Sequence, residues 1–239
     1  LTARTVVSNV NPSLLYGSMV DRKELPDDFA RRISQYRNGS GTFRMNVALN
    51  ALPRFTCLEQ QARATEDHLT GGIVIGPTME YLDKSYRDAR EYGWSREPLV
   101  EMLIPSLVDD SLAPPGQHVA SLFCQQFDPD VDWDQHRDTA AECILDQVEK
   151  FAPGFKASVV GRQVLSPLDL ERKFGLTRGD IMHGALNVDQ MFSARPMLGH
   201  GDYRAPIKRL YMCGAGTHPG GGVTGAPGHN AAREILRDL

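Results

Sequence analysis

A glycine-rich stretch near the end of the chain has the composition and spacing of a ligand-binding loop. It reads Gly214-Ala215-Gly216-Thr217-His218-Pro219-Gly220-Gly221-Gly222-Val223-Thr224-Gly225. A predicted strand (207–213) precedes it and a predicted helix (226–236) follows it. Unpaired N–H groups and the positive end of the helix dipole both point at such a bend, and glycines let the backbone approach a ligand closely. The pattern favours an anionic or electron-rich ligand, with a ligand-free turn as the alternative.

The type of loop narrows the choice of ligand. A P-loop ends in Gly-Lys-Ser/Thr, and no lysine follows Lys208, so that class is excluded. Gly214 and Gly216, with Gly220, resemble a Rossmann fingerprint. That fold needs further β/α units and an acidic residue about twenty residues on, whereas only residues 226–239 remain after the loop. If a dinucleotide binds, this loop closes its domain and the rest of the sheet precedes it.

The rest of the chain supplies the elements that must position this loop. Apolar Phe43, Met45, Val47 and Leu49 alternate with polar or small residues, which predicts a half-buried strand in an antiparallel sheet. Thr78 and Gly93 bracket a predicted helix, and Ser166 caps another. The further elements are predicted as a buried strand at 5–8, helices at 28–36, 133–151 and 167–174, strands at 99–107 and 118–127, and a loop at 179–205. The predicted class is α+β, with α/β character at the C-terminal strand, loop and helix.

Composition limits the partners and the compartment. The chain has 239 residues, 41% hydrophobic and 23% charged, with a net charge of −4. No Lys/Arg cluster offers a nucleic-acid footprint, so we expect no nucleic-acid partner. No apolar run is long enough to span a bilayer. The cysteines, Cys57, Cys124, Cys143 and Cys213, share no metal-binding spacing and predict buried thiols in a reducing compartment. We expect a cytoplasmic or mitochondrial-matrix protein that is not secreted.

Several motifs together resemble the phytoene-desaturase-like family of FAD-dependent oxidoreductases, including the animal pyridine nucleotide-disulphide oxidoreductase domain proteins. The resemblance is carried by 203–207, 210–223 and 225–232, and further upstream by 166–171, 179–184, Gly71-Gly72, Gly76-Pro77 and 6–9. It spans nearly the whole chain. It implies a doubly wound FAD-binding sheet, built from separated pieces, with an inserted, mostly antiparallel substrate domain.

The resemblance also implies a division of the chain. Residues 1–11 would return to the FAD domain, 12–175 would form the substrate domain, and 176–239 would close the FAD domain. The family's opening piece carries a Gly-x-Gly-x-x-Gly pyrophosphate loop, and the only opening candidate, Gly39-Ser40-Gly41, lacks the third glycine. Because the chain begins at Leu1 in a predicted strand, we expect part of a longer protein. Alone, it should be inactive and bind FAD weakly or not at all.

The implied cofactor contacts lie in the glycine loop: Gly214, Ala215, Gly216, Gly221, Gly222, Val223, Thr224 and Gly225. Many related flavoenzymes have Asp or Glu at the position of Ala215, so no side-chain contact is assigned there. Thr224 has two readings, a hydroxyl donor to the cofactor or a cap of the next helix. The implied chemistry is hydride transfer from a C–H bond to flavin N5, with the helix N-terminus stabilising the negative charge of reduced flavin.

Catalytic residues are not identified by the sequence. His218 lies inside the loop, and it faces either the ligand or a structural partner. His183, His200 and His229 have no metal-ligand spacing, so we expect no metal site. The strands at 43–49 and 99–107 would line a chamber for an apolar small-molecule substrate, or simply form a sheet core. Peripheral contact with a membrane or lipid is one option, and the sequence gives no oligomeric state.

Two other function classes remain open at this stage. One is a non-catalytic binding or scaffold protein that keeps the flavoprotein fold. The other is an NAD(P)-binding domain, which the terminal position of the loop disfavours. Bound flavin in the whole protein would favour an enzyme over the first of these two classes.

Overall fold

The computed structural model describes residues 2–39, 41–61 and 66–239. Leu1, Ser40 and residues 62–65 lie outside the described residues. The Gly39-Ser40-Gly41 stretch is therefore described only in part. In the described ranges no helix has the length and apolarity needed to cross a bilayer. The chain divides into two compact units, Leu1–Ser40 with Glu171–Leu239, and Gly41–Leu170. The first unit is therefore built from both ends of the chain, and the second is inserted between them.

These boundaries differ from those predicted after residues 11 and 175. The segment that follows residue 11 folds with the C-terminal part, because Leu15, Phe29 and Ile33 share a hydrophobic core with Met197 and Met212. The second boundary falls inside helix α6 (Pro167–Phe174) rather than after it. The inserted unit is shorter at both ends than the sequence suggested.

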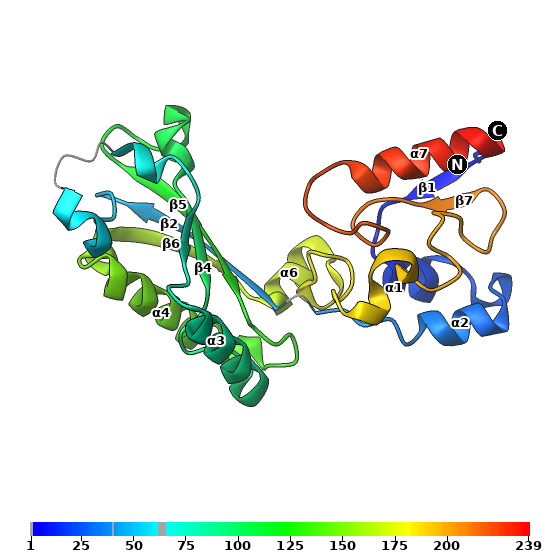
Figure 1. Cartoon of the computed structure of the whole chain (residues 1–239), viewed down its shortest axis with the longest axis horizontal. Helices are drawn as coiled ribbons and strands as arrows, with labels where there is room; N and C mark the ends of the chain where they lie inside the picture. Colours follow the sequence, from blue (N-terminus) through cyan, green and yellow to red (C-terminus); the bar gives the residue numbers. More distant parts are fainter. Residues whose placement is uncertain (1, 40, 62–65) are drawn as a thin grey trace. The chain divides into compact units, whose positions relative to one another are not determined.

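The inserted unit contains the predicted antiparallel sheet (Figure 1). It has five strands, in the order β3-β4-β5-β2-β6. Its strands are β2 (Thr42–Leu49), β3 (Ile73–Ile75), β4 (Val100–Leu103), β5 (His118–Gln125) and β6 (Val159–Leu165). β2 lies between β5 and β6, with Met45 opposite both Leu122 and Val164. Strands β3 and β6 were not among the predicted strands.

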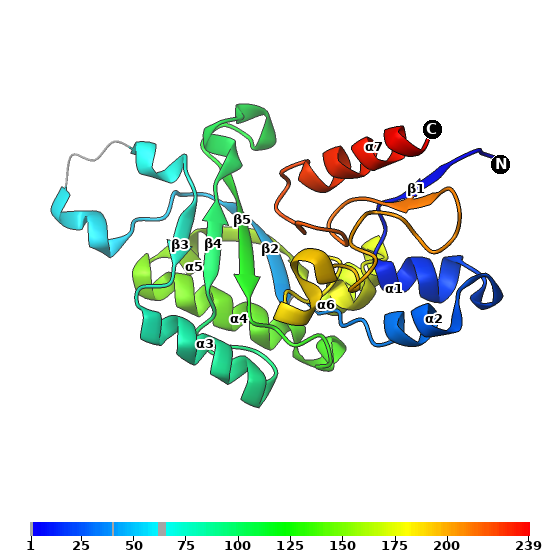
Figure 2. The same ribbon diagram turned by 45° about the vertical axis from the view of Figure 1, so that its right-hand side comes forward.

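One face of this sheet is covered by α4 (Trp133–Phe151) (Figure 2). A core of buried side chains lies between the helix and the sheet. The alternating apolar residues of β2 point into this core because side chains on a strand alternate between faces. Trp133 is almost fully buried against the rings of Phe43 and Phe127, and its indole N–H donates to the Asp128 carbonyl at 2.9 Å. This core is the main stabilising feature of the inserted unit.

Helix α3 (Met79–Tyr92) has the ends that its sequence predicted. The Thr78 hydroxyl accepts from the Tyr81 amide at 3.1 Å, and Gly93 ends the helix in a left-handed conformation with φ 89°. Tyr81 then donates its hydroxyl to the Pro98 carbonyl at 2.8 Å, which ties α3 to the segment before β4. The short helix α5 (Phe155–Ser158) links α4 to β6.

The first unit contains a parallel pair of strands, β1 (Val6–Ser8) and β7 (Leu210–Met212), together with α7 (Ala226–Asp238). Helices α1 (Pro12–Leu14) and α2 (Asp27–Ile33) and a π-helical turn (Leu15–Met19) follow β1. Short 3-10 turns in the chain lie at Arg22–Glu24, Thr56–Gln61, Glu66–Leu69, Pro105–Leu107, Asp110–Leu112, Thr177–Gly179, Val188–Gln190 and Phe192–Ala194.

The prediction that β1 is buried was wrong. Val6 and Val7 are 51% and 48% exposed. Because consecutive strand residues point to opposite faces, both faces of β1 are open. The short apolar sequence alone could not distinguish a covered strand from an open one.

Candidate functional site

The two parallel strands bring distant parts of the chain to one edge. Val6, Val7 and Ser8 pair with Leu210, Tyr211 and Met212, and the Cys213 amide donates to the Ser8 carbonyl at 2.8 Å. Parallel strands have their carboxyl ends at the same edge, where ligands bind in open α/β sheets. The segment after β1 therefore meets the glycine loop after β7. A β-carbon on Gly214 would lie 3.3 Å from Cβ of Asn9, in direct contact.

The glycine loop, residues 214–225, uses backbone conformations that side chains disfavour. Gly214, Gly220, Gly222 and Gly225 all have positive φ, at 81°, 102°, 127° and 73°. Val223 also has a positive φ of 56°, although it is β-branched, and its side chain is fully exposed. A β-branched residue in this region is strained, and such strain gathers at ligand sites. The loop backbone is thus held in a specific, uncommon shape.

Few amides of the glycine loop are satisfied within it. Thr217 donates its amide to the Gly214 carbonyl at 3.1 Å, and Gly220 donates to the Thr217 carbonyl at 2.7 Å. Within the part of the chain that the structure describes, the nine other amides of the loop have no protein acceptor: those of Gly214, Ala215, Gly216, His218, Gly221, Gly222, Val223, Thr224 and Gly225. Backbone N–H groups without protein acceptors need water or a ligand. The glycine loop thus offers a row of free donors.

The start of α7 adds to this set of donors. Its N-cap is Gly225, which has no side chain to satisfy the first helical amides, and its first turn holds no acidic residue. The Thr224 hydroxyl accepts from the Ala226 amide at 3.2 Å. Of the two readings of Thr224, the capping one therefore has a hydrogen bond in the structure. The helix start presents partial positive charge to the glycine loop.

Three histidines of the first unit, His183, His200 and His218, differ in their surroundings. His218 lies 6.3 Å from Phe192 between ring centroids, and its Nδ1 is buried without a partner. His183 Nδ1 is also buried without a partner, and burial lowers the pKa of this imidazole below its ordinary value. Burial likewise lowers the pKa of His200. In the described ranges no three His, Cys, Asp or Glu side chains form a metal-binding group.

A second glycine spacing in the loop escaped the sequence analysis. Gly220, Gly222 and Gly225 match Gly-x-Gly-x-x-Gly and lead directly into α7. A dinucleotide fingerprint, however, follows its strand at once, whereas residues 213–219 separate this one from β7. The spacing makes the helix start glycine-rich without giving the usual strand-turn-helix context.

Two buried charges beside the glycine loop were also missed. Asp180 and Arg195 are almost completely buried in the 179–205 segment, which was predicted only as a loop. Asp180 lies in one of the family-like motifs, but nothing in its pattern indicated burial. For Arg195, the spacing of neighbouring residues gave no sign that its side chain is buried.

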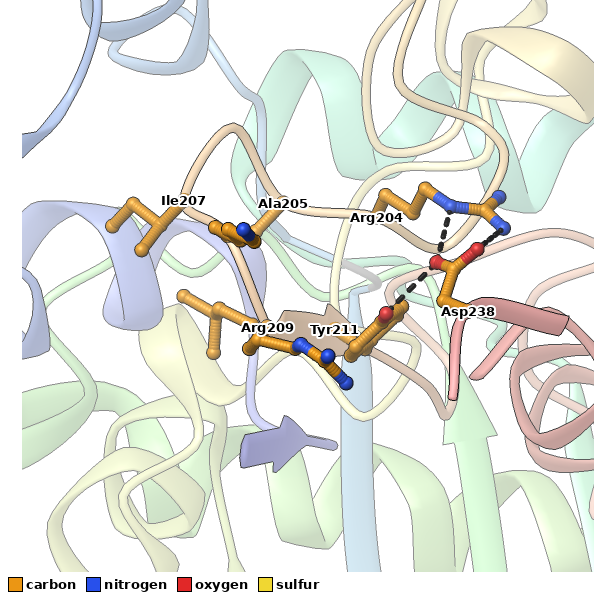
Figure 3. Close-up of a pocket in the computed structure, with 8 residues that line it drawn as sticks. Arg204, Ala205, Ile207, Arg209, Tyr211 and Asp238 are labelled. Carbon is orange, nitrogen blue, oxygen red and sulfur yellow. Dashed lines mark hydrogen bonds and ion pairs between the residues drawn. The ribbon is translucent and has the colours of Figure 1, made fainter. Parts of the chain in front are cut away.

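A pocket of about 340 Å³ is lined by side chains that include Arg204, Tyr211 and Asp238 (Figure 3). Its lining lies around the start of β7, at the opposite end of the strand from the glycine loop. Arg204 donates to both carboxylate oxygens of Asp238, at 2.8 and 2.9 Å, and Tyr211 donates its hydroxyl to the same carboxylate at 2.8 Å. These bonds anchor the end of α7. Because the pocket is at the amino end of the strand, it is not the ligand edge of a parallel sheet.

Of the two readings of the strands predicted at 43–49 and 99–107, the structure shows the sheet core. The apolar residues of β2 lie in the core beneath α4, not along an open surface. The other face of the sheet carries Arg44 and Phe123, which stack at 5.2 Å, and the exposed Leu103 and Val74. Any ligand that binds this sheet therefore meets a mixed polar and apolar face.

Comparisons with known proteins agree on one group of oxidoreductases. No family model matches the chain. It is 41% identical over 245 residues to the rat protein named pyridine nucleotide-disulfide oxidoreductase domain-containing protein 2, covering 99% of this chain and 42% of that one. It is 25% identical over 251 residues to a limonene dehydrogenase component of Castellaniella defragrans, covering 100% of this chain and 45% of that one. The chain spans less than half the length of these relatives.

A shorter match and two solved structures extend this picture. A lycopene-forming phytoene desaturase of Pseudescherichia vulneris is 30% identical over 151 residues, covering 56% of this chain and 28% of the relative. An oxidoreductase from Methanosarcina mazei has a TM-score of 0.57 at 15% identity, covering 99% of this chain and 43% of that one. Cyclohexylamine oxidase from Brevibacterium oxydans has a TM-score of 0.53 at 16% identity, and the match covers 100% of this chain and 44% of that one. At these identities the structures show a shared fold.

Proposed function

We propose that the chain is the C-terminal part of a phytoene-desaturase-like oxidoreductase, and that the whole protein is an FAD-dependent dehydrogenase or desaturase. Proteins of this group are generally flavoproteins. The observation that supports FAD here is the row of free amides in the glycine loop, at the edge that β7 shares with β1. A non-catalytic protein that keeps the fold is the alternative.

The residues proposed to contact the flavin fit an electron-rich ring edge. They are Gly214, Ala215, Gly216, Gly221, Gly222, Val223, Thr224 and Gly225. Bound flavin would supply an acceptor for hydride from a substrate C–H bond. The chain itself contributes fixed N–H donors and the positive end of α7, which favour negative charge without reorganisation. No side chain of the glycine loop needs to act as an acid or base in this scheme.

The proposed substrate is a small, largely apolar molecule. The open face of the five-stranded sheet supports this class, because it presents the exposed Leu103 and Val74, and Phe123 with the guanidinium of Arg44 over its ring. We propose no nucleic-acid partner. Exposed apolar side chains of the first unit, among them Val188, Phe192 and Leu198, support peripheral contact with a membrane or lipid.

The proposed compartment is a reducing one, the cytoplasm or the mitochondrial matrix. All four cysteines are free thiols in the structure. The prediction that they are buried holds for Cys124 and is wrong for Cys57, which is exposed, while Cys143 and Cys213 are half-buried. Burial raises the pKa of the Cys124 thiol, which makes it less reactive, as expected for a core residue. Fractionation of cells that express the tagged whole protein tests this placement.

The experiment that tests the function is a flavin measurement on the whole protein. We expect a yellow protein with a flavin absorption spectrum, whose colour bleaches when a suitable apolar substrate is added without oxygen. A colourless protein that rejects added FAD would support the scaffold alternative.

The same measurement on this chain alone tests the division of the FAD site. We expect weak flavin binding, because the opening loop that holds the pyrophosphate in the family is proposed to lie in the remainder of a longer protein. Tight, stoichiometric flavin on this chain would show that the Gly220, Gly222 and Gly225 spacing suffices without a second glycine loop.

A further inference from the structure

The guanidinium of Arg195 is buried and bound only by backbone carbonyls. The residue is 1% exposed. Its Nε donates to the Ala215 carbonyl at 2.9 Å, and its two terminal nitrogens donate to four further carbonyls, those of Met182 (2.6 Å), Gln190 (3.1 Å), Gly184 (3.3 Å) and Ala185 (3.5 Å). Arginine has five N–H donors, so each one has an acceptor. A buried charge requires this degree of compensation.

Asp180 lies on the other side of the same segment. It is completely buried, and its carboxylate accepts from the amides of Gly39 at 2.7 Å, Met182 at 2.8 Å and Gly184 at 3.1 Å. The short segment 182–184 therefore gives N–H groups to Asp180 and carbonyls to Arg195. Its charge-assisted hydrogen bonds are stronger than those between neutral groups.

The middle of this segment is held as firmly. The Tyr36 hydroxyl donates to the His183 carbonyl at 2.8 Å, and the His183 amide donates to the Asp180 carbonyl at 3.3 Å. All six backbone polar groups of 182–184 thus have partners, although His183 and Gly184 have positive φ values of 55° and 137°. A backbone held this completely persists in a conformation that it would otherwise leave.

This clamped segment touches the glycine loop at two places. The Nε bond of Arg195 reaches Ala215 at the start of the loop. Further along, Met182 packs against Gly221, since a β-carbon there would lie 2.6 Å from the Met182 sulfur. The shape of the glycine loop is therefore coupled to the buried Asp180 and Arg195 charges.

The bond to Ala215 has a directional consequence. A trans peptide is planar, so its carbonyl and its N–H point in opposite directions. With the Ala215 carbonyl held toward Arg195, the N–H of Gly216 points away from Arg195. This amide is one of the free donors of the glycine loop in the described part of the chain. Arg195 thus determines where that donor is aimed.

We propose that Arg195 is a positioning residue that aims the Gly216 amide at the ligand of the glycine loop, with Asp180 holding the segment that buries it. The identity of the ligand as flavin rests on the proposed function. The positioning itself rests only on contacts within the first unit.

The test compares Arg195→Lys and Arg195→Met in the whole protein with Arg233→Met, an exposed arginine on α7. Hydrogen exchange reports on the amides of 182–184 and 214–222 whether or not flavin is present. FAD affinity and the flavin midpoint potential report on the aim of the donor. Lysine keeps the charge but cannot supply five donors in a fork. The Arg195→Lys variant should therefore fold and still fail to position the glycine loop.

We expect both Arg195 variants to exchange these amides about tenfold faster and to bind FAD about tenfold more weakly. The Arg195→Lys variant should also shift the midpoint potential of the flavin that remains bound. Arg233→Met should match the wild type in every readout. Wild-type exchange, affinity and potential in Arg195→Lys would overturn the proposal. So would faster exchange spread evenly over the first unit without a change in potential. A wild-type protein without flavin would refute the proposed function, while the exchange data would still decide the positioning.

Discussion

Pro12 packs directly against Gly216, so that a β-carbon on Gly216 would come within 2.7 Å of Pro12 Cδ. Pro12 begins α1, just after the carboxyl end of β1, and Gly216 lies in the glycine loop after β7. The proline ring is rigid and cannot move aside as a flexible side chain would. The contact therefore requires glycine at this position.

Replacing Gly216 by alanine should disturb the junction between these two segments. We expect the Gly216→Ala variant to lose about 1–3 kcal/mol of unfolding free energy from overpacking, and the whole protein to retain less flavin. Urea unfolding and the flavin-to-protein absorbance ratio measure the two effects. Gly228→Ala is the control, because nothing lies within 4 Å of its added methyl group. Equal stability of the two variants would mean that Pro12 yields.

The parts of the fold that the sequence predicted well are those decided by local signals. Helix α3 has the expected caps, the Thr78 hydroxyl before its first residue and the left-handed Gly93 after its last. Helix α4 has the predicted bounds, 133–151. Strand β2 follows its apolar alternation, with Met45 and Val47 in the core. In each case neighbouring residues along the chain are sufficient to specify the element.

The features that were missed depend on distant residues. β6 contains the polar run Gly161, Arg162 and Gln163, and it is a strand because it pairs with β2. The burial of Arg195 depends on five carbonyls that only the folded loop assembles. The glycine loop was recognisable from its composition. The clamp that shapes it was not, because nothing in the local sequence distinguishes a buried arginine from a surface one.

The two faces of the five-stranded sheet should respond differently to the same substitution. Leu122 on β5 is fully buried in the core, whereas Leu103 on β4 is 54% exposed on the opposite face. We expect Leu122→Ala to cost about 2–5 kcal/mol of unfolding free energy, and Leu103→Ala to cost about 0.5 kcal/mol or less. Chemical denaturation of both variants measures this. A large loss for Leu103→Ala would mean that this face is covered in solution.

Stability at acid pH should depend on Glu97. Hydrogen bonds from Lys150, at 2.8 Å, and from Lys84 hold its pKa at about 2, below the ordinary value of 4.5. Since the folded-state pKa is the lower one, the stabilisation is complete above about pH 4.5 and is lost as the pH falls toward 2. Glu97 is 30% exposed, so solvent screens the effect.

The Glu97→Gln variant should therefore lose less unfolding free energy than the wild type between about pH 5 and pH 3. Urea titrations at several pH values provide the comparison. Glu24→Gln, at an exposed position in the other compact unit, is the control and should follow the wild type. Parallel curves for the wild type and Glu97→Gln would rule out this contribution.

A carboxylate at the start of α7 should separate ligand binding from stability. Gly225 and Gly175 both have positive φ, 73° and 68°, and a β-carbon added to either would have no atom within 4 Å. Aspartate at either site carries a similar backbone strain of about 1–2 kcal/mol. At Gly225 the helix N-terminus partly offsets that strain, because it favours negative charge. Only there does the new carboxylate compete for the free amides of the glycine loop.

We expect Gly225→Asp in the whole protein to weaken FAD binding about tenfold or more, and Gly175→Asp to leave it unchanged. Calorimetric titration with FAD measures both, and equal affinities would place the flavin away from the start of α7.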